Sequence, residues 1–460
     1  MPEGSRMAVN AELKDALDRR IDERAEDFLS WLVELVSIPS VSATGEGIRE
    51  CAAVLRNRME GLGIRVELLE TGGEPLLWGE IGDGITSGPR PIFYGHYDVQ
   101  PAAMSEGWVH PPFSPVVRDG AIWGRGVGDN KGQLIAHLCA LAAWLDVEGR
   151  PPPFPVRFAF DGEEEIGSPR TIPFIQENPG WFTGDFVYCA DGSTIGVWNP
   201  AMFLEFHGLL YLELETMGAG AEWHSGSYGS VLPNPVLHMA GALRALVDET
   251  GHVLVPGFYD DVVPPTEAKR RLLDLLPEDF LTDPSRYEAT RFATDNPREA
   301  MFFLPKMCVC GFSGGYTDPG VKTAVPTGAT AKLDITLAPS QSPETITSLI
   351  RHHLDNVGFG DVSIRALAVC PPVATSYDSP LFRLAENAMR NVWGKQPVIF
   401  PSIGGGGPMA AFASLGLECI SVPYAQADLH EHSIEEHLSL EWFLNGIKTS
   451  AELFRLMAAQ

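Results

Sequence analysis

The segment 156–168 constrains the fold and the chemistry of this chain more than any other. The β-favouring run 156–160 predicts a short strand, which stops at four carboxylates between Asp161 and Glu165. Because α/β proteins bind ligands at the carboxyl ends of their strands, we expect the three glutamates of this segment to lie at such an edge. The following Ser168 and Pro169 predict the cap and the first residue of a helix. The alternative is an acidic surface turn without a function. A metal ion or a shared proton would instead make the clustered carboxylates a functional site.

The bulk properties of the chain narrow the class of protein. A chain of 460 residues is too long for one ordinary core, so two domains are expected. Hydrophobic residues make up 45% and charged residues 20%, as in soluble globular proteins, and seven scattered cysteines do not indicate a disulfide framework. The formal net charge of −27 argues against nucleic acid and anionic membranes as partners. The sequence shows no signal-like segment and no apolar run of about 18 residues, so we expect no membrane span and a cytoplasmic location.

The order of the predicted elements indicates an α/β protein with an insertion. Apolar residues between positions 13 and 35 recur at helical spacing and predict one long amphipathic helix that ends before Pro39. Strands and helices alternate over roughly the first 200 residues, which favours a mostly parallel sheet with helices on both faces. The pattern then changes to alternating strands with two helices, which predicts an inserted α+β domain with an antiparallel sheet. We therefore expect one domain in two parts, residues 1–206 and 371–460, and an inserted domain, residues 207–370.

Histidines and carboxylates gather at the ends of the predicted strands. They are His96, Asp129, Glu164 with Glu165, and Asp191, and a further cluster occupies residues 430–437. Mixed histidine and carboxylate ligands suit zinc, manganese or cobalt. Residues 404–407 form a run of glycines before another predicted helix. These glycines either cradle an anion at the start of that helix or only permit close packing.

Several motifs together resemble a known family. They read His96-x-Asp98, Gly128-Asp129-x-Lys131-Gly132, Glu164-Glu165-x-Gly167-Ser168, Asp191 and His432, with His224-Ser225-Gly226-x-Tyr228-Gly229 in the insert. Their order and spacing, from about residue 30 to residue 460, resemble the dinuclear metallopeptidases of the aminoacylase, carboxypeptidase G and succinyl-diaminopimelate desuccinylase family. The carnosinase-like dipeptidase branch of that family is the most similar.

The resemblance implies two divalent metal ions, with Zn²⁺ expected and Mn²⁺ or Co²⁺ as alternatives. The implied ligands are His96, Asp129 and Asp191 for one metal, and Asp129, Glu165 and His432 for the other, with Asp129 as the bridge. The family spacing His-Ser-x-x-Glu favours His432 over His430 as the ligand.

The same resemblance implies the catalytic groups. Asp98 would orient the imidazole of His96, and Glu164 would be the general base that takes a proton from the metal-bridged water. His224 resembles a histidine that stabilises the oxyanion across a dimer interface, so a homodimer is expected and the insert would serve as lid and dimerisation domain. The implied activity is hydrolysis of an amide C–N bond in a small, peptide-like molecule.

The chain departs from the family at its substrate-binding positions. Two motifs that carry arginine in the dipeptidase branch have Thr336 and Ser402 in its place. Losing a charge-assisted contact of this kind commonly costs about 1.5–3 kcal/mol. We therefore expect the natural substrate to differ from an ordinary dipeptide. Substrate contacts are predicted at Asn234, Thr336, Ser402, Gly405 and Gly406.

Other functions remain open at this point. An N-acyl amino acid amidohydrolase and a deaminating hydrolase are alternatives on the same metal centre. A metal-binding protein without catalysis is a further alternative, although Glu164 and the complete ligand set argue against it.

Overall fold

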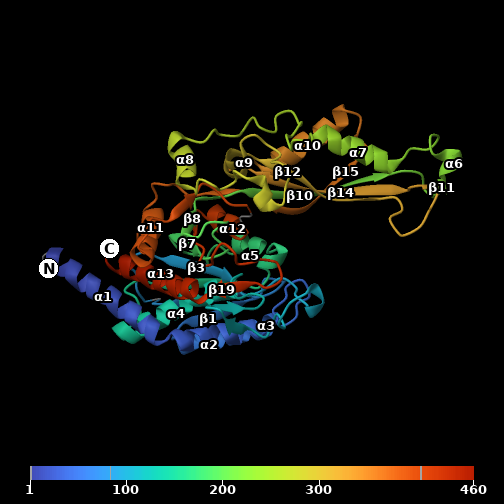
Figure 1. The fold of residues 1–460 in the computed structure, drawn as a ribbon. Helices are drawn as coiled ribbons and strands as arrows, with labels where there is room; N and C mark the ends of the chain where they lie inside the picture. The colour runs from blue at the N-terminus through green and yellow to red at the C-terminus, as the bar shows by residue number, and fades with distance from the viewer. Residues whose placement is uncertain (1–2, 83, 405–406) are drawn as a thin grey trace. The chain divides into compact units, whose positions relative to one another are not determined.

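The computed structural model describes residues 3–82, 84–404 and 407–460 (Figure 1). The chain divides into two compact units. Unit 1 comprises Met1–Leu204, Thr375–Phe400 and Gly407–Gln460, and unit 2 comprises Glu205–Ala374 and Pro401–Gly406.

Unit 1 is built on an eight-stranded mixed sheet in the order β1-β2-β6-β3-β7-β18-β8-β17. Its strands are β1 (Arg65–Leu69), β2 (Leu76–Ile81), β3 (Pro91–His96), β6 (Val156–Asp161), β7 (Phe186–Cys189), β8 (Ala201–Phe203), β17 (Val398–Phe400) and β18 (Glu418–Ser421). The central strands β6, β3, β7 and β18 run parallel to one another, whereas β1 and β2 pair antiparallel at one edge. Since parallel strands end at the same edge, His96 lies directly opposite Asp161 in the register.

Helices cover both faces of this sheet, as expected. They are α1 (Glu3–Glu23), α2 (Ala25–Val36), α3 (Ile48–Gly61), α4 (Lys131–Glu148), α5 (Thr171–Glu177), α11 (Pro380–Trp393), α12 (Met409–Ser414) and α13 (Leu440–Ala458). Successive residues of β3 show the two faces, because side chains alternate along a strand. The ring of Tyr94 packs against Phe412 of α12, whereas a side chain at Gly95 would meet Leu134 of α4.

Two predictions about helices in unit 1 are wrong. The single long helix predicted near the start of the chain is two helices, α1 and α2, with Arg24 between them. Helix α5 begins at Thr171, not at Pro169, and no side chain caps it. Ser168 has a left-handed backbone with φ of 49°, and its hydroxyl donates instead to Asp161 Oδ2 at 2.7 Å. The Ser168 hydroxyl therefore binds the Asp161 carboxylate and does not cap the helix.

A small three-stranded sheet completes unit 1. It pairs β4 (Val116–Arg118) and β5 (Ala121–Trp123) with β19 (His437–Ser439) from near the other end of the chain. His437 lies opposite Trp123, and the two rings are stacked with centroids 4.1 Å apart. This pairing fixes the segment just before β19, which contains the predicted ligand His432.

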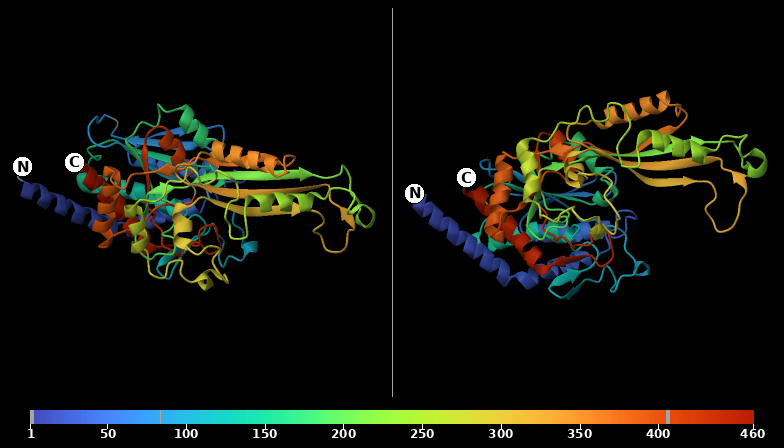
Figure 2. Two further views of the ribbon diagram at one scale, coloured as in Figure 1. Left: turned by 90° about the horizontal axis from the view of Figure 1, so that it is seen from above. Right: turned by 45° about the horizontal axis from the view of Figure 1, so that its top comes forward.

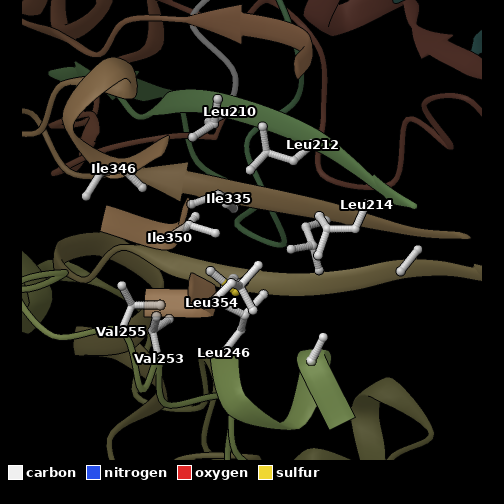
Figure 3. Packing of buried hydrophobic residues seen from close by; sticks show 14 of the residues in the cluster. Leu210, Leu212, Leu214, Leu246, Val253, Val255, Ile335, Ile346, Ile350 and Leu354 are labelled. Atoms are coloured by element: carbon white, nitrogen blue, oxygen red, sulfur yellow. The ribbon is translucent and has the colours of Figure 1, made fainter. Parts of the chain in front are cut away.

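Unit 2 contains a four-stranded antiparallel sheet in the order β12-β14-β10-β15, with helices α7 and α10 on one face. The elements are β10 (Gly208–Met217), β12 (Lys306–Gly314), β14 (Gly328–Leu337), β15 (Ser363–Cys370), α7 (Pro235–Leu246) and α10 (Pro343–Asn356). Alternate residues of β10, such as Leu210, Leu212 and Leu214, bury their side chains in one cluster with residues of those helices (Figure 3). Figure 2 shows the long strands β10 and β14 side by side from two further directions. The antiparallel sheet and its two helices confirm the predicted fold class of the insert.

Shorter elements flank this sheet. They are β9 (Glu205–Phe206) paired with β16 (Val373–Ala374), β11 (Trp223–His224) paired with β13 (Ala324–Val325), and helices α6 (Ser225–Tyr228), α8 (Glu267–Leu272) and α9 (Pro297–Phe303). Within the described residues, no helix combines the length and the apolar character needed to cross a membrane.

Candidate metal centre

The carboxylate of Asp98 organises one side of the candidate site. Strand β3 delivers His96, whose Nδ1 lies 3.3 Å from Asp98 Oδ1 and 3.1 Å from the Asp98 carbonyl oxygen. The same carboxylate accepts the backbone N–H groups of Glu164 at 3.1 Å and Glu165 at 3.0 Å. Asp98 therefore fixes the imidazole and the loop after β6 relative to each other, with its own side chain fully buried.

Asp129 lies between two histidines from distant parts of the chain. Its Oδ1 is 3.1 Å from His96 Nε2, and its Oδ2 is 2.9 Å from His432 Nε2. Glu165 Oε2 also lies 2.9 Å from His432 Nε2. One oxygen of Asp129 thus faces each histidine, which is the arrangement that a bridging carboxylate between two cations requires.

The two remaining carboxylates of the cluster are held by amides. The side-chain amide of Gln100 donates to Glu165 Oε2 at 2.9 Å. Asn130 Nδ2 donates to Asp191 Oδ1 at 2.7 Å. Asp191 Oδ1 and Glu164 Oε2 lie 3.7 Å and 3.9 Å from His96 Nε2. The structure therefore brings together all six predicted residues, namely His96, Asp129, Glu164, Glu165, Asp191 and His432.

The loop that carries Asp129 is fixed by a buried glutamate. Glu436 Oε1 accepts the backbone N–H groups of Gly128 at 3.0 Å and Asp129 at 3.1 Å. Its Oε2 accepts Gly126 N–H at 3.0 Å and Arg125 Nη1 at 2.8 Å. A Cβ atom at Gly128 would come within 2.0 Å of the Leu429 side chain, so a larger residue would have to displace that leucine. Sequence reasoning assigned no role to Glu436, although it stands as the last residue of the His-Ser-x-x-Glu motif.

The neighbouring Glu163 does not join the cluster. Its Oε1 accepts the backbone N–H groups of Arg170 and Thr171, both at 2.6 Å. Asp161 accepts the hydroxyl groups of Ser168 and Thr171 at 2.7 and 2.8 Å. These two carboxylates shape the turn after β6, which leaves Glu164 and Glu165 to face the centre.

The segment 430–437 adds a carboxylate that the sequence did not single out. Glu431, Asp129 and His432 each offer a ligand atom, and these atoms lie within 4.8 Å of one another. His96, Asp129 and Glu165 form a second such group. His430 and His432 both adopt positive φ, of 60° and 55°. Backbone strain of this kind persists at functional sites where the surrounding structure enforces it.

The electrostatics of the cluster show an excess of negative charge. The pKa of Glu164 is raised well above its usual range by burial and by Asp191 and Glu165, against the opposing effect of His96. Hydrogen bonds that the His432 ring donates to the carboxylates of Asp129 and Glu165 raise the pKa of His432 to about 11. Burial opposes protonation of His96, but the carboxylates around it, Asp191 first, raise its pKa well above the usual value. The site is therefore most stable with added positive charge.

This donor set fits two divalent metal ions. Two imidazoles and three carboxylates face one another, and the carboxylate of Asp129 lies beside both imidazoles. Imidazole with carboxylate oxygen is the ligand chemistry of zinc, manganese and cobalt. The amides of Gln100 and Asn130 and the carboxylate of Asp98 fix the ligand side chains from behind, as outer partners do in metal sites.

The other predicted site residues lie in unit 2 or outside the described residues. His224 is exposed at the start of α6, and its Nδ1 accepts Gly226 N–H at 3.1 Å. Asn234 caps α7 by accepting Val236 N–H and Leu237 N–H. Thr336 lies on β14, and Ser402 donates to the Phe302 carbonyl oxygen at 2.6 Å. The predicted contacts Gly405 and Gly406 lie outside the described residues.

Comparison with known proteins shows which family has this fold and this cluster of residues. Unit 1 carries on its eight-stranded sheet a cluster of histidines and carboxylates that could hold metal ions, and unit 2 has a separate antiparallel sheet. The model of the Peptidase family M20/M25/M40 matches residues 92–456, most of the chain. The chain belongs to this family. Family membership implies a dinuclear metal centre and a small peptide as substrate.

Individual relatives agree with this assignment over nearly their whole length. The Beta-Ala-His dipeptidase of Homo sapiens is 28% identical across 96% of this chain and 91% of its own. The Cys-Gly metallodipeptidase dug1 of Schizosaccharomyces pombe is 27% identical across 94% of this chain and 96% of its own. Among solved structures, the metallo-carboxypeptidase Sso-CP2 from Sulfolobus solfataricus is 32% identical with a TM-score of 0.88, covering 94% of this chain and 99% of that one. Human carnosine dipeptidase 1 is 26% identical with a TM-score of 0.82, covering 97% of this chain and all of that one.

Proposed function

We propose that this protein hydrolyses an amide C–N bond in a small, peptide-like molecule, with Glu164 as the proton-transferring residue. The observation that carries the proposal is the position of Glu164. Its carboxylate lies beside His96 within the ligand cluster, and Asp98 holds its backbone in place.

Each residue of the cluster has a distinct task in this proposal. His96, Asp129 and Asp191 bind one metal, and Asp129, Glu165 and His432 bind the other. When bound, the two cations polarise the scissile carbonyl and increase the acidity of water. Glu164 Oε2 takes a proton from the attacking water and then gives it to the leaving nitrogen.

The metal preference follows from the ligands. The proposed ligands have the chemistry that zinc prefers, namely imidazole nitrogen and carboxylate oxygen, and we propose Zn²⁺ as the resident ion. They are Asp129, Glu165, Asp191 and the two histidines. A site rich in carboxylate oxygens also accepts Mn²⁺ or Co²⁺. Loading the protein separately with each ion and comparing kcat would identify the preferred metal.

The test of the proposed reaction is hydrolysis of a panel of dipeptides, N-acyl amino acids and their carboxamides by the metal-loaded protein, read by mass spectrometry. The variant Glu164→Gln should lose turnover by about 10²–10⁴-fold while its metal content remains at two ions per chain. Glu163→Gln, the same change one residue earlier, should lower the rate of turnover by about tenfold at most. A wild-type protein that cleaves no member of the panel would refute the proposal. Preferential cleavage of the N-acyl amino acids would instead favour the amidohydrolase alternative.

We also propose that the active unit is a homodimer in which His224 acts on the substrate bound by the other copy. His224 is exposed, and its neighbours Trp223 and Tyr228 are exposed aromatic residues. Exposed aromatic side chains are frequent in interfaces between copies. Stabilisation of an oxyanion is a task that a histidine N–H can perform.

Complementation between two inactive variants tests this arrangement. His224→Ala and Glu164→Gln should each be inactive alone, and mixing them after subunit exchange should restore about a quarter of wild-type activity, since half the dimers are mixed and each has one complete site. Light scattering should show a dimer for both variants. A mixture that stays inactive would place His224 in the site of its own chain.

A further inference from the structure

Two exposed cysteines lie two residues apart on an edge strand of unit 2. The structure describes all seven cysteines of the chain, and each is a free thiol. Cys308 and Cys310 on β12 are exposed, whereas the other five are buried, namely Cys51, Cys139, Cys189, Cys370 and Cys419. Strand β12 stands at one end of the strand order of its sheet, so β14 is its only neighbour there within the described residues. The two thiols are therefore accessible to a reagent from solvent.

A β-bulge changes the spacing of these two side chains. The register of β12 against β14 shifts between Val309 and Gly311, so Cys310 is an extra residue without a direct partner on β14. In a regular strand each residue advances the chain by about 3.3 Å, which places Cβ atoms two residues apart at about 6.6 Å. A disulfide requires Cβ atoms about 3.8 Å apart. A bulge bends the strand at the extra residue, and a disulfide between Cys308 and Cys310 requires a distortion of this kind.

Both thiols project from the face of the sheet that is opposite the core of unit 2. Cys308 pairs with Asp334, which lies between the core residues Leu333 and Ile335. Since side chains alternate along a strand and direct partners share a face, Asp334 and Cys308 point away from that core. The Cys310 thiol forms a side-chain hydrogen bond with Cys308 and therefore lies on the same face. The two sulfur atoms are thus neighbours before any bond joins them.

The surroundings favour uncharged forms of this pair. Partial desolvation, the hydrogen bond with Cys308 and the Asp334 carboxylate raise the pKa of the Cys310 thiol. Asp334 Oδ1 is buried without a hydrogen-bond partner in the described structure. Repulsion by this carboxylate disfavours a lasting thiolate, whereas a protonated dithiol and a disulfide both carry no charge.

A metal ion is an alternative ligand for two thiols. Structural zinc sites need four protein ligands. Within the described residues, the two groups of three candidate ligand residues both lie in the metal centre of unit 1, and neither contains a cysteine. The residues around Cys308 and Cys310 therefore do not complete a site of that kind, and oxidation is the chemistry that two neighbouring thiols can perform by themselves.

We propose that Cys308 and Cys310 are a reversible thiol–disulfide pair, oxidised to a disulfide within β12 by a small disulfide such as oxidised glutathione. One cysteine attacks a sulfur atom of oxidised glutathione as its thiolate, and one glutathione thiolate leaves. The other cysteine attacks the protein sulfur of this mixed disulfide, which forms the Cys308–Cys310 bond and releases the second glutathione. The two cysteine protons pass to the two released thiolates. Exposed or strained disulfides are easily reduced, so reduced glutathione reverses the reaction.

Mass spectrometry of the full-length, metal-loaded protein tests the proposal. The protein is equilibrated in buffers with increasing ratios of oxidised to reduced glutathione, quenched with acid, unfolded and alkylated. Trypsin then releases residues 307–322 as one peptide that contains both cysteines. As the ratio rises, the form of this peptide with two alkyl groups should be replaced by a form with an internal disulfide, and dithiothreitol should restore the first form. The five buried cysteines should stay alkylated throughout and serve as the internal reference.

Single substitutions test whether the second cysteine resolves the mixed disulfide. Cys308→Ser and Cys310→Ser should each accumulate a glutathione adduct at the remaining thiol, at about 10-fold or more the wild-type level, because a neighbouring thiol acts at a high effective concentration. Ser313→Ala, a small change on the same strand, is the matched control and should form the disulfide as the wild type does. The wild-type titration decides the question even if a variant does not fold.

The proposal is overturned by any of three results. These are a peptide 307–322 that stays fully alkylated at every glutathione ratio, a stable glutathione adduct on the wild type in place of the internal disulfide, or a disulfide that joins two chains. None of these results bears on the proposed hydrolysis, since the pair lies within unit 2 and includes no residue assigned to the metal centre.

Discussion

The contact between Glu436 and the loop that carries Asp129 gives the sharpest prediction about stability. Glu436 is fully buried and Arg125 is 2% exposed. Each oxygen of Glu436 accepts two N–H groups, at distances between 2.8 and 3.1 Å. In Glu436→Gln the new amide NH₂ replaces one of these oxygens, so it faces two buried donors and leaves both unsatisfied.

The expected cost follows from those two lost contacts. A buried donor without a partner costs about 1–3 kcal/mol, and removal of one member of a buried ion pair costs about 3–5 kcal/mol, so we expect a loss of about 3–5 kcal/mol. The free energy of unfolding is measured by urea denaturation of the metal-loaded protein at pH 7.5. Glu435→Gln is the matched control, because Glu435 pairs with the partly exposed Arg118 and should cost about 1 kcal/mol. Equal losses in the two variants would refute the reasoning.

Three further predictions concern other parts of unit 1. Asp98→Asn should weaken metal binding by about 10-fold to 100-fold in competition with a chromogenic chelator, since it disturbs His96 and the loop after β6; unchanged affinity would contradict the positioning role. Removal of the metals with EDTA should lower the free energy of unfolding by about 3 kcal/mol, compared with protein in free metal at about 100 times the Kd for that metal. An unfolding midpoint that is the same with and without EDTA would argue against a metal centre that stabilises the fold. His137 is fully buried, and burial lowers its pKa to about 3, below the unfolded value of 6.5. Its contribution to stability is therefore complete above pH 6.5 and is lost as the pH falls toward 3, so the wild type should lose about 2 kcal/mol more than His137→Gln between pH 7 and 5; parallel pH profiles would exclude this assignment.

Much of the fold and of the metal centre could be predicted because the signals are local. Apolar strands that end in His96 or in the glutamates after β6 can be recognised from about ten residues each, and parallel strands bring such ends together without further information. The antiparallel sheet of the insert follows from alternating residues such as those of β10. The same local reading gave a wrong helix start at Ser168, because the carboxylate that binds its hydroxyl belongs to the end of β6.

The residues that could not be predicted act through contacts between distant segments. In the sequence, nothing distinguishes Glu436 from other acidic residues. Its contact with the loop that carries Asp129 depends on the pairing of β19 with β5. The pairing of Lys306 with Thr336 likewise depends on the register of β12 against β14. Register is set by packing of the whole sheet, which a single sequence does not reveal.

The long-range bond between Glu436 and Gly128 has a consequence for the order of events in folding. The two residues are 308 positions apart in sequence, and the same segment supplies His432. Closing so large a loop costs entropy that only the contacts of a nearly complete unit 1 can offset. Partly folded chains therefore hold His96 and Asp129 without the second histidine. Acquisition of the full metal pair should be the last kinetic phase of refolding, slower than formation of helices and of the central strands.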